Sequence, residues 1–168
     1  MLPNRFSSVS YFRNFIFGVE DSLVSTVGLL SGVAVANVPK TTILLTGIIL
    51  LLVEGLSMAV GSFLTESSVE EYTHQAPGLA KNNVVSGIIM FFSYFLTGFI
   101  PLSPYLIWSV NVALVISAVF SVLSLFILGV VSAKLSGTNI FKDGFRMAFV
   151  GGMAIAVGIL AGSILSKI

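Results

Sequence analysis

The chain has 168 residues, of which 56% are hydrophobic and only 9% charged, and its formal net charge at pH 7 is +1. A water-soluble domain cannot cover its surface with so few polar side chains, and so small a charge argues against nucleic acid as a partner. The absence of cysteine excludes disulfides, thiolate metal sites and a cysteine nucleophile. We therefore expect an all-α integral membrane protein.

Five apolar stretches predict a bundle of five transmembrane helices, in a single transmembrane domain over residues 1–168. About 20 apolar residues cross the ~30 Å hydrocarbon core, so five crossings use nearly the whole chain and leave no room for a catalytic domain. The predicted spans are 15–36, 41–64, 83–101, 105–131 and 145–166. The predicted breaks are 37–40, the polar stretch 65–82, the proline-containing 101–104, and 134–146 with its two glycines.

Basic residues set the expected orientation, because lysine and arginine are enriched in cytoplasmic loops. With the N-terminus in the cytoplasm, only Lys40 and Lys167 lie on the far side of the membrane. The residues then expected on the cytoplasmic side are Arg5, Arg13, Lys81, Lys134, Lys142 and Arg146. This bias predicts a cytoplasmic N-terminus, and an odd number of spans places the C-terminus on the opposite side.

Three acids fall inside the predicted spans, although the chain has only seven Asp and Glu residues. They are Glu20 and Asp21 in the first span and Glu54 in the second. A charge near mid-membrane costs roughly 2.5 to 3.5 kcal/mol on insertion scales, and no Lys or Arg lies deep in a span to neutralise these acids. Such residues indicate a path for cations or protons. Glu20 lies only ~8 Å along the helix from residue 15, where it can simply be solvated, so Asp21 and Glu54 are the stronger candidates.

Helical spacing adds Met58 to this group, because Met58 follows Glu54 by four residues and shares its face of the helix. The first helix leaves the cytoplasm and the second returns to it, so Asp21 and Met58 each lie ~9 Å from the cytoplasmic ends of their helices. A carboxylate beside a thioether suits Fe²⁺ or Mn²⁺ better than Mg²⁺ or Ca²⁺. Methionine in an apolar helix more often fills space, so Met58 by itself is equally consistent with packing.

An acidic group follows the second span: Glu66, Glu70, Glu71 and His74 stand three to four residues apart. These side chains share one face if the second helix continues beyond the membrane, and that spacing can bind metal. The simpler alternative is a solvated helix end. If the group does bind metal, we expect it to capture the ion rather than translocate it, since it lies outside the hydrocarbon.

The residues also bear on the class of protein and on its assembly. His74 is the only histidine and lies outside the spans, and no nucleophile and base pair is evident, so we expect no enzyme and no cofactor. A passive cation channel or a structural scaffold, with its acids lining a water-filled cleft, remains the alternative to a carrier. Asp21, Glu54 and Met58 supply only three ligands, whereas a two-fold axis through the site would supply the six of an octahedral ion, which favours a homodimer.

Small residues in the last span allow close helix packing, either within the chain or between copies. They form two stripes, Gly144, Ala148, Gly152 and Ala156 in one, and Ala154, Gly158 and Gly162 in the other.

Four segments, in order along the chain, resemble the vacuolar iron transporter family. Residues 54–61 resemble its Ser-Met-x-x-Gly motif, Pro101 and Pro104 its Pro-x-x-Pro turn after the third span, and 128–137 the end of its fourth span. The first span matches at Arg13, Ile16, Phe17, Gly18, Asp21, Val24, Gly28, Leu29 and Gly32.

This resemblance implies a homodimeric five-span carrier, in a plasma or vacuolar-type membrane, that exchanges cytosolic Fe²⁺, often Mn²⁺ too, for protons. By the same resemblance, Asp21 and Met58 match the family's translocation residues.

The chain departs from the family in three places. Plant-type members carry a helical cytoplasmic metal-binding domain between spans two and three, where this chain has only 65–82. The family's deeper second-span carboxylate falls at Leu50, and Glu54 is the residue here that can replace it. The family's Asp-Gly pair becomes Asp21-Ser22.

Overall fold

The computed structural model describes residues 3–72 and 80–167, and the side chains of 8–72 and 82–167. Its helices are α1 (Pro3–Val35), α2 (Lys40–Tyr72), α3 (Ala80–Thr97), α4 (Phe99–Ile107), α5 (Val110–Ser136) and α6 (Ile140–Leu165). Helices α3 and α4 belong to one stretch, Asn82–Ile107, so the described chain has five stretches long and apolar enough to cross a membrane. The predicted all-α fold with five spans is confirmed.

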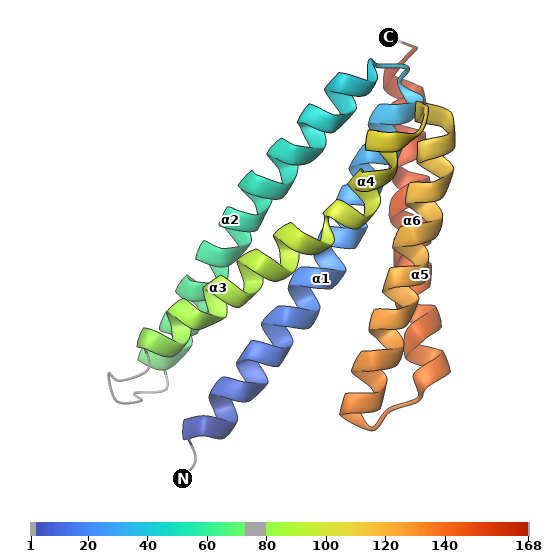
Figure 1. Cartoon of the computed structure of the whole chain (residues 1–168). Helices are drawn as coiled ribbons and strands as arrows, with labels where there is room; N and C mark the ends of the chain where they lie inside the picture. Colours follow the sequence, from blue (N-terminus) through green and yellow to red (C-terminus); the bar gives the residue numbers. More distant parts are fainter. Residues whose placement is uncertain (1–2, 73–79, 168) are drawn as a thin grey trace.

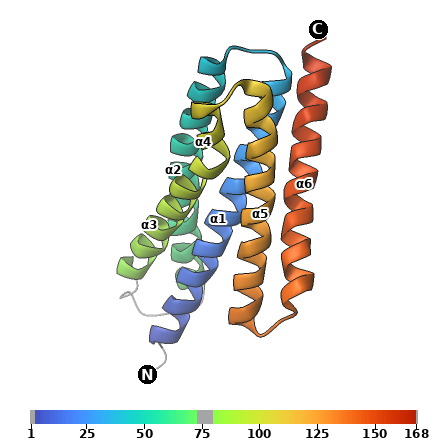
Figure 2. The ribbon, with the colours of Figure 1, turned by 45° about the vertical axis from the view of Figure 1, so that its right-hand side comes forward.

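The helices run up and down the bundle and leave their connections at two ends (Figures 1 and 2). One end holds the start of α1, the end of α2 and the α5–α6 turn, and we call it the N-terminal end. The other end holds the α1–α2 and α4–α5 turns and the C-terminus. Lys142 and Arg146, near the α5–α6 turn, therefore lie at the opposite end from Lys40 and Lys167, as the predicted orientation requires. Which end faces the cytoplasm stays a prediction.

The third span is longer than expected, because the break predicted at 101–104 lies inside a helix. Pro101 and Pro104 are both buried in α4, and the turn comes instead at Trp108 and Ser109. A proline inside a helix leaves the carbonyl four residues earlier without its backbone donor. For Pro104 that carbonyl belongs to Ile100, and it accepts a hydrogen bond of 3.1 Å from the Ser103 hydroxyl.

Pro101 explains the short interruption between α3 and α4 in the same way. It has no N–H for the carbonyl of Thr97, the last residue of α3, and α4 begins after Gly98. The carbonyl of Pro101 accepts a hydrogen bond of 2.7 Å from Ser117 of α5. The prolines therefore bend and dock this span without ending it, and the next helix starts at Val110 rather than at residue 105.

Four other helices also extend past a predicted end. Helix α1 begins at Pro3, before residue 15, and α5 continues to Ser136, beyond residue 131. Helix α2 continues to Tyr72, beyond residue 64, and α6 begins at Ile140, before residue 145. Gly137 ends α5 in the left-handed conformation (φ 70°), which glycine adopts without steric cost. Asn139 then caps α6 by accepting a hydrogen bond of 3.1 Å from the backbone N–H of Lys142.

Helix α1 is the centre of the bundle and packs against every other helix of the described chain. Its contact with α6 is closest, because a Cβ added to Gly158 would lie 2.0 Å from the Gly28 carbonyl oxygen. A Cβ on Gly162 would likewise lie 2.0 Å from the Gly32 carbonyl oxygen. The second stripe of small residues in the last span therefore serves packing within the chain. In the other stripe, Gly152 faces open space, with no atom within 4 Å of an added Cβ.

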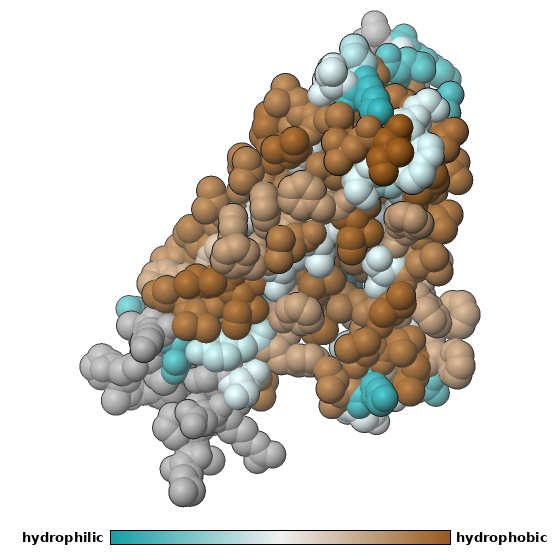
Figure 3. All heavy atoms as spheres, viewed as in Figure 1, coloured by the Kyte–Doolittle hydropathy of each residue, from teal (hydrophilic) through white to brown (hydrophobic). Residues whose placement is uncertain are grey.

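The outer surface is apolar over most of its height. In Figure 3, brown side chains cover the middle of the visible face, and teal side chains gather toward its ends. The side chains of Leu45, Val115 and Leu160 are 59%, 58% and 61% exposed and come from three different helices. Exposed apolar surface this continuous is typical of contact with lipid.

Candidate functional site

The structure brings together acids from two helices, as the sequence predicts. Asp21 of α1 lies close enough to Glu54 of α2, and to its neighbour Glu20, for their negative charges to repel one another. All three side chains are half-buried. Tyr94 of α3 lies in the same region, close enough that the charges of both Asp21 and Glu54 would repel an ionised Tyr94 hydroxyl. Three helices thus meet around one acidic cluster, which we define as Asp21, Glu54 and Tyr94.

Tyr94 is the member of this cluster that the sequence does not single out. Its side chain is wholly buried, and its hydroxyl shares a hydrogen bond of 2.7 Å with Ser25, one turn after Asp21. Ser22 of α1 donates a further hydrogen bond of 2.6 Å to the backbone carbonyl of Tyr94. A tyrosine in an apolar helix needs a partner for its hydroxyl, and that need is the only signal the sequence offers. These bonds hold the Asp21 face of α1 against α3.

Met58 lies one turn beyond Glu54 and is half-buried. It packs against the core cluster that contains Leu51 and Tyr94. This contact with the apolar core suits packing, and the position one turn from Glu54 keeps the ligand role open.

No basic side chain neutralises the acidic cluster within the described ranges. The ion pairs there are Arg13 with Glu66 and Arg146 with Asp143, and both lie toward the N-terminal end. Burying an unpaired carboxylate is costly, so such a site favours a bound cation, water or protons. Among described residues, no three His, Cys, Asp or Glu side chains form a group that could hold a metal ion.

The acidic group at the end of α2 is only partly free to bind metal. The helix continues to Tyr72, as the shared face requires, and Glu71 is exposed. Glu66 accepts hydrogen bonds from Arg13 and from Ser10 of α1.

Glu70 is engaged on the other side, where it accepts a hydrogen bond of 2.8 Å from the Asn83 amide of α3. Glu66 and Glu70 thus tie the last turns of α2 to α1 and α3. The remaining residue of the predicted group, His74, lies outside the described residues.

Comparison with known proteins gives one consistent match. A family model described as the VIT family matches residues 12–77 and 71–163. Vacuolar iron transporter 1 of Arabidopsis thaliana is 25% identical over 90% of this chain and 84% of its own length. Vacuolar iron transporter homolog 1 of Oryza sativa subsp. japonica is 27% identical over 92% of this chain and 73% of its own. An uncharacterized protein of Methanocaldococcus jannaschii is 26% identical over 92% and 89%.

Proposed function

Because this chain belongs to the VIT family, we propose that it carries Fe²⁺, and Mn²⁺ as well, out of the cytosol in exchange for protons. It is a multi-pass membrane protein, and its named relatives are transporters rather than enzymes. The observation that carries the proposal is the pairing of Asp21 with Glu54, two half-buried acids on different helices with no basic partner in the described chain.

The mechanism is competition between metal and protons for the same carboxylates. Asp21 and Glu54 bind the ion when deprotonated and release it when protonated from the outer side. The Met58 sulfur adds a softer ligand, which shifts preference from Mg²⁺ and Ca²⁺ toward Fe²⁺. Exchange then needs no group beyond these side chains.

A homodimer completes the ligand set, with the ion path at or near the two-fold axis. Two copies of Asp21, Glu54 and Met58 give six ligands, enough for octahedral Fe²⁺. Gly61, nearly one turn after Met58, supports this arrangement, because nothing lies within 4 Å of a Cβ built on it. That part of α2 has room for a second copy to approach closely.

Cysteine cross-linking tests where the copies meet. The chain has no cysteine, so single substitutions give an unambiguous signal. We expect Gly61→Cys to form a covalent dimer in oxidised membranes, and Gly152→Cys, an equally open position on α6, to stay largely monomeric. Electrophoresis without reductant measures the ratio. Cross-linking at Gly152 alone would place the interface on α6 and away from the acids.

Uptake into proteoliposomes tests the function itself. Fe²⁺ and Mn²⁺ uptake should rise when an imposed pH gradient supplies protons for exchange, and proton release should accompany it. A passive channel would follow the metal gradient whatever the pH difference, and a structural scaffold would give no uptake above that of empty liposomes.

Selectivity should depend on Met58. Met58→Leu keeps the volume and removes the sulfur, so Fe²⁺ transport should fall several-fold relative to any Mg²⁺ or Ca²⁺ leak. Parallel uptake of the four ions by wild type and variant gives the ratio. An unchanged metal profile would assign Met58 to packing alone.

If the acidic group at the end of α2 captures metal, its removal should change the kinetics of uptake rather than the metal selectivity. Replacing Glu70, Glu71 and His74 together by alanine should raise the apparent KM for metal and leave the maximal rate within a few fold, since uniform binding is lost. Because Glu70 also bonds Asn83, Glu70→Gln is the control for that contact. A collapse of the maximal rate would place these residues on the transport path. If neither KM nor the maximal rate changed, the group would be only a solvated helix end.

A further inference from the structure

A polar pocket opens at the N-terminal end between α5 and α6, away from the acidic cluster. Its volume is about 440 Å³, and it lies where α5 ends at Ser136 and α6 begins at Ile140. Both are ends of candidate membrane spans, so the pocket lies at the level expected for lipid headgroups. The polar side chains that line it with hydroxyl, amide or cationic groups are Ser132, Ser136, Thr138, Asn139, Lys142 and Arg146.

The charges in this pocket are only partly compensated. Its one acid, Asp143, accepts a hydrogen bond from Thr138 and lies 3.8 Å from Arg146. The side-chain ammonium of Lys142 has no hydrogen-bond or ion-pair partner among the described residues, unlike the guanidinium of Arg13, which pairs with Glu66. The pocket therefore keeps a net positive charge with an available ammonium group.

The neutral donors in the pocket suit an anion with several oxygens. The hydroxyls of Ser132 and Ser136, one turn apart on α5, have no intramolecular partner in the described part of the chain. The first turn of α6 also opens here, and a helix N-terminus favours negative charge. Two cations and two hydroxyls around one space match the oxygens of a phosphate group.

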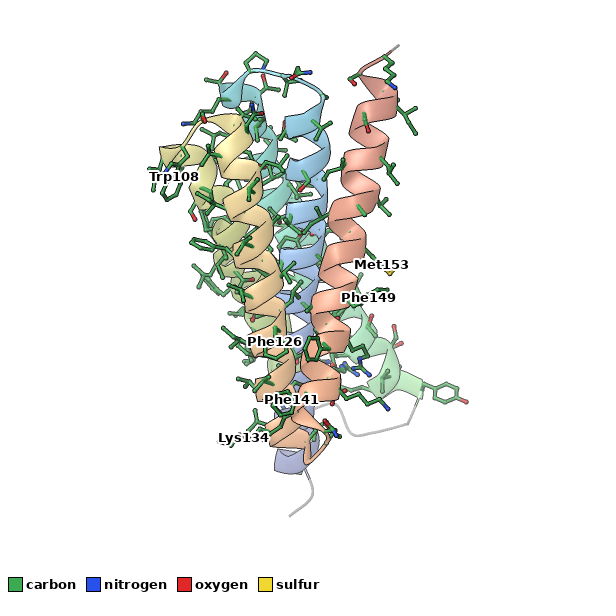
Figure 4. All side chains as sticks on the ribbon, turned by 90° about the vertical axis from the view of Figure 1, so that its right-hand side faces the viewer. Trp108, Phe126, Lys134, Phe141, Phe149 and Met153 are labelled. Carbon is green, nitrogen blue, oxygen red and sulfur yellow. The ribbon has the colours of Figure 1, made fainter. Side chains whose placement is uncertain are left out.

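Apolar side chains lie beside the cations on the same helix. Phe141 and Phe145 are 71% and 66% exposed, and Phe145 stands three residues from Lys142 and one from Arg146. The Phe145 ring packs edge-on against Phe126 of α5, with ring centroids 5.3 Å apart. Figure 4 shows Phe141 near the α5–α6 turn, Phe126 higher on α5, and Phe149 about two turns beyond Phe141 on α6. Acyl chains can follow that apolar face while a headgroup occupies the pocket.

We propose that this pocket binds the phosphate headgroup of an anionic phospholipid, whose acyl chains lie along the phenylalanine face of α6. Free phosphate would use the cations but would gain nothing from the aromatic side chains, so the apolar face favours the lipid. Basic pockets between membrane helices bind anionic headgroups by this combination of charge and depth. The proposal does not depend on the transported ion.

Native mass spectrometry of the full-length purified chain tests this site. Phosphatidylglycerol should bind about thirtyfold more tightly than phosphatidylcholine with the same acyl chains, because each of the two basic residues contributes roughly 1 kcal/mol near the surface. Lys142→Gln with Arg146→Gln should abolish that preference. The matched control, Lys134→Gln with Lys167→Gln, removes the same charge outside the pocket and should keep it.

Four outcomes would overturn the proposal. Equal loss of preference in both double variants would show diffuse attraction to basic charge, and unchanged preference in the pocket variant would place the lipid elsewhere. Displacement of phosphatidylglycerol by millimolar inorganic phosphate would show a site for a free anion. If the pocket variant unfolds earlier than wild type in phosphatidylcholine, Lys142→Gln and Ser132→Ala are tested singly. Lys142→Gln should lower the preference about fivefold, Ser132→Ala should weaken binding of phosphatidylglycerol about threefold, and no change in either quantity would also refute the site.

Discussion

We expect Asp21→Asn to abolish metal uptake while expression, folding and dimerisation stay close to wild type. The amide has the shape of the carboxyl group but cannot take a negative charge, so it loses both the attraction to a divalent ion and the exchangeable proton. Asp21 is half-buried beside Glu54, and no basic side chain of the described chain pairs with either. Removing one charge should even relieve the repulsion between them, so the fold should not suffer.

Glu20→Gln is the matched control for Asp21→Asn. Glu20 is the adjacent acid and is also half-buried, and with α1 beginning before residue 15 it lies at mid-span rather than near a membrane surface. The carboxylates near the Tyr94 hydroxyl are those of Asp21 and Glu54, so neutralising Glu20 should leave uptake within a few fold. Initial rates of Fe²⁺ uptake in proteoliposomes, normalised to reconstituted protein, measure both variants. Wild-type uptake by Asp21→Asn would remove this residue from the mechanism, and equal losses in both variants would assign the effect to net charge.

The largest loss of stability should come from adding methyl groups to the α1–α6 contact. In Gly158→Ala with Gly162→Ala, each new Cβ would lie 2.0 Å from a backbone carbonyl oxygen, of Gly28 and Gly32 respectively. Backbone atoms cannot rotate away as a side chain can, so the two helices must separate. Overpacking of this kind costs about 1 to 3 kcal/mol for each site. The double variant should therefore unfold many degrees below wild type, or fail to accumulate.

Gly152→Ala is the control that distinguishes the loss of the α1–α6 contact from a general effect of placing alanine in α6. No atom lies within 4 Å of a Cβ built on Gly152, and alanine has the higher helix propensity, so this variant should be as stable as wild type or slightly more. Thermal unfolding in detergent, followed by circular dichroism, gives the midpoints. Equal midpoints for the double variant and the control would show that α1 and α6 do not approach as closely as described.

The sequence predicted the number and approximate position of the spans, because membrane crossing depends on local apolar length. It placed the break between the third and fourth spans at 101–104, where the structure has helix α4. A proline normally signals the end of a helix, but here hydrogen bonds from Ser103 and Ser117 to backbone carbonyls stabilise a helix that contains two prolines. Of these, the bond from Ser117 joins segments distant in sequence and is invisible to a reading along the chain.

For the candidate site, too, the sequence predicts part of the arrangement and the packing of the helices decides the rest. Asp21 and Glu54 stand out from the sequence alone, since a charge inside an apolar span is expensive wherever the helix packs. That they approach each other, with Tyr94 beside them and its hydroxyl bonded to Ser25, depends on how α1, α2 and α3 pack. The sequence likewise left open which glycine stripe of α6 serves the chain itself.

The sequence by itself therefore determined an all-helical membrane protein with five spans and with unpaired acids in the first two. It could do so because these features depend on the transfer of each residue from water to hydrocarbon. The free energy of that transfer is a sum over residues and needs no knowledge of partners. Only the tertiary structure decided which polar groups satisfy one another and where backbones touch. In lipid, apolar side chains are equally well placed on every face of a helix, so the choice of neighbours rests on close glycine contacts and a few hydrogen bonds between distant segments.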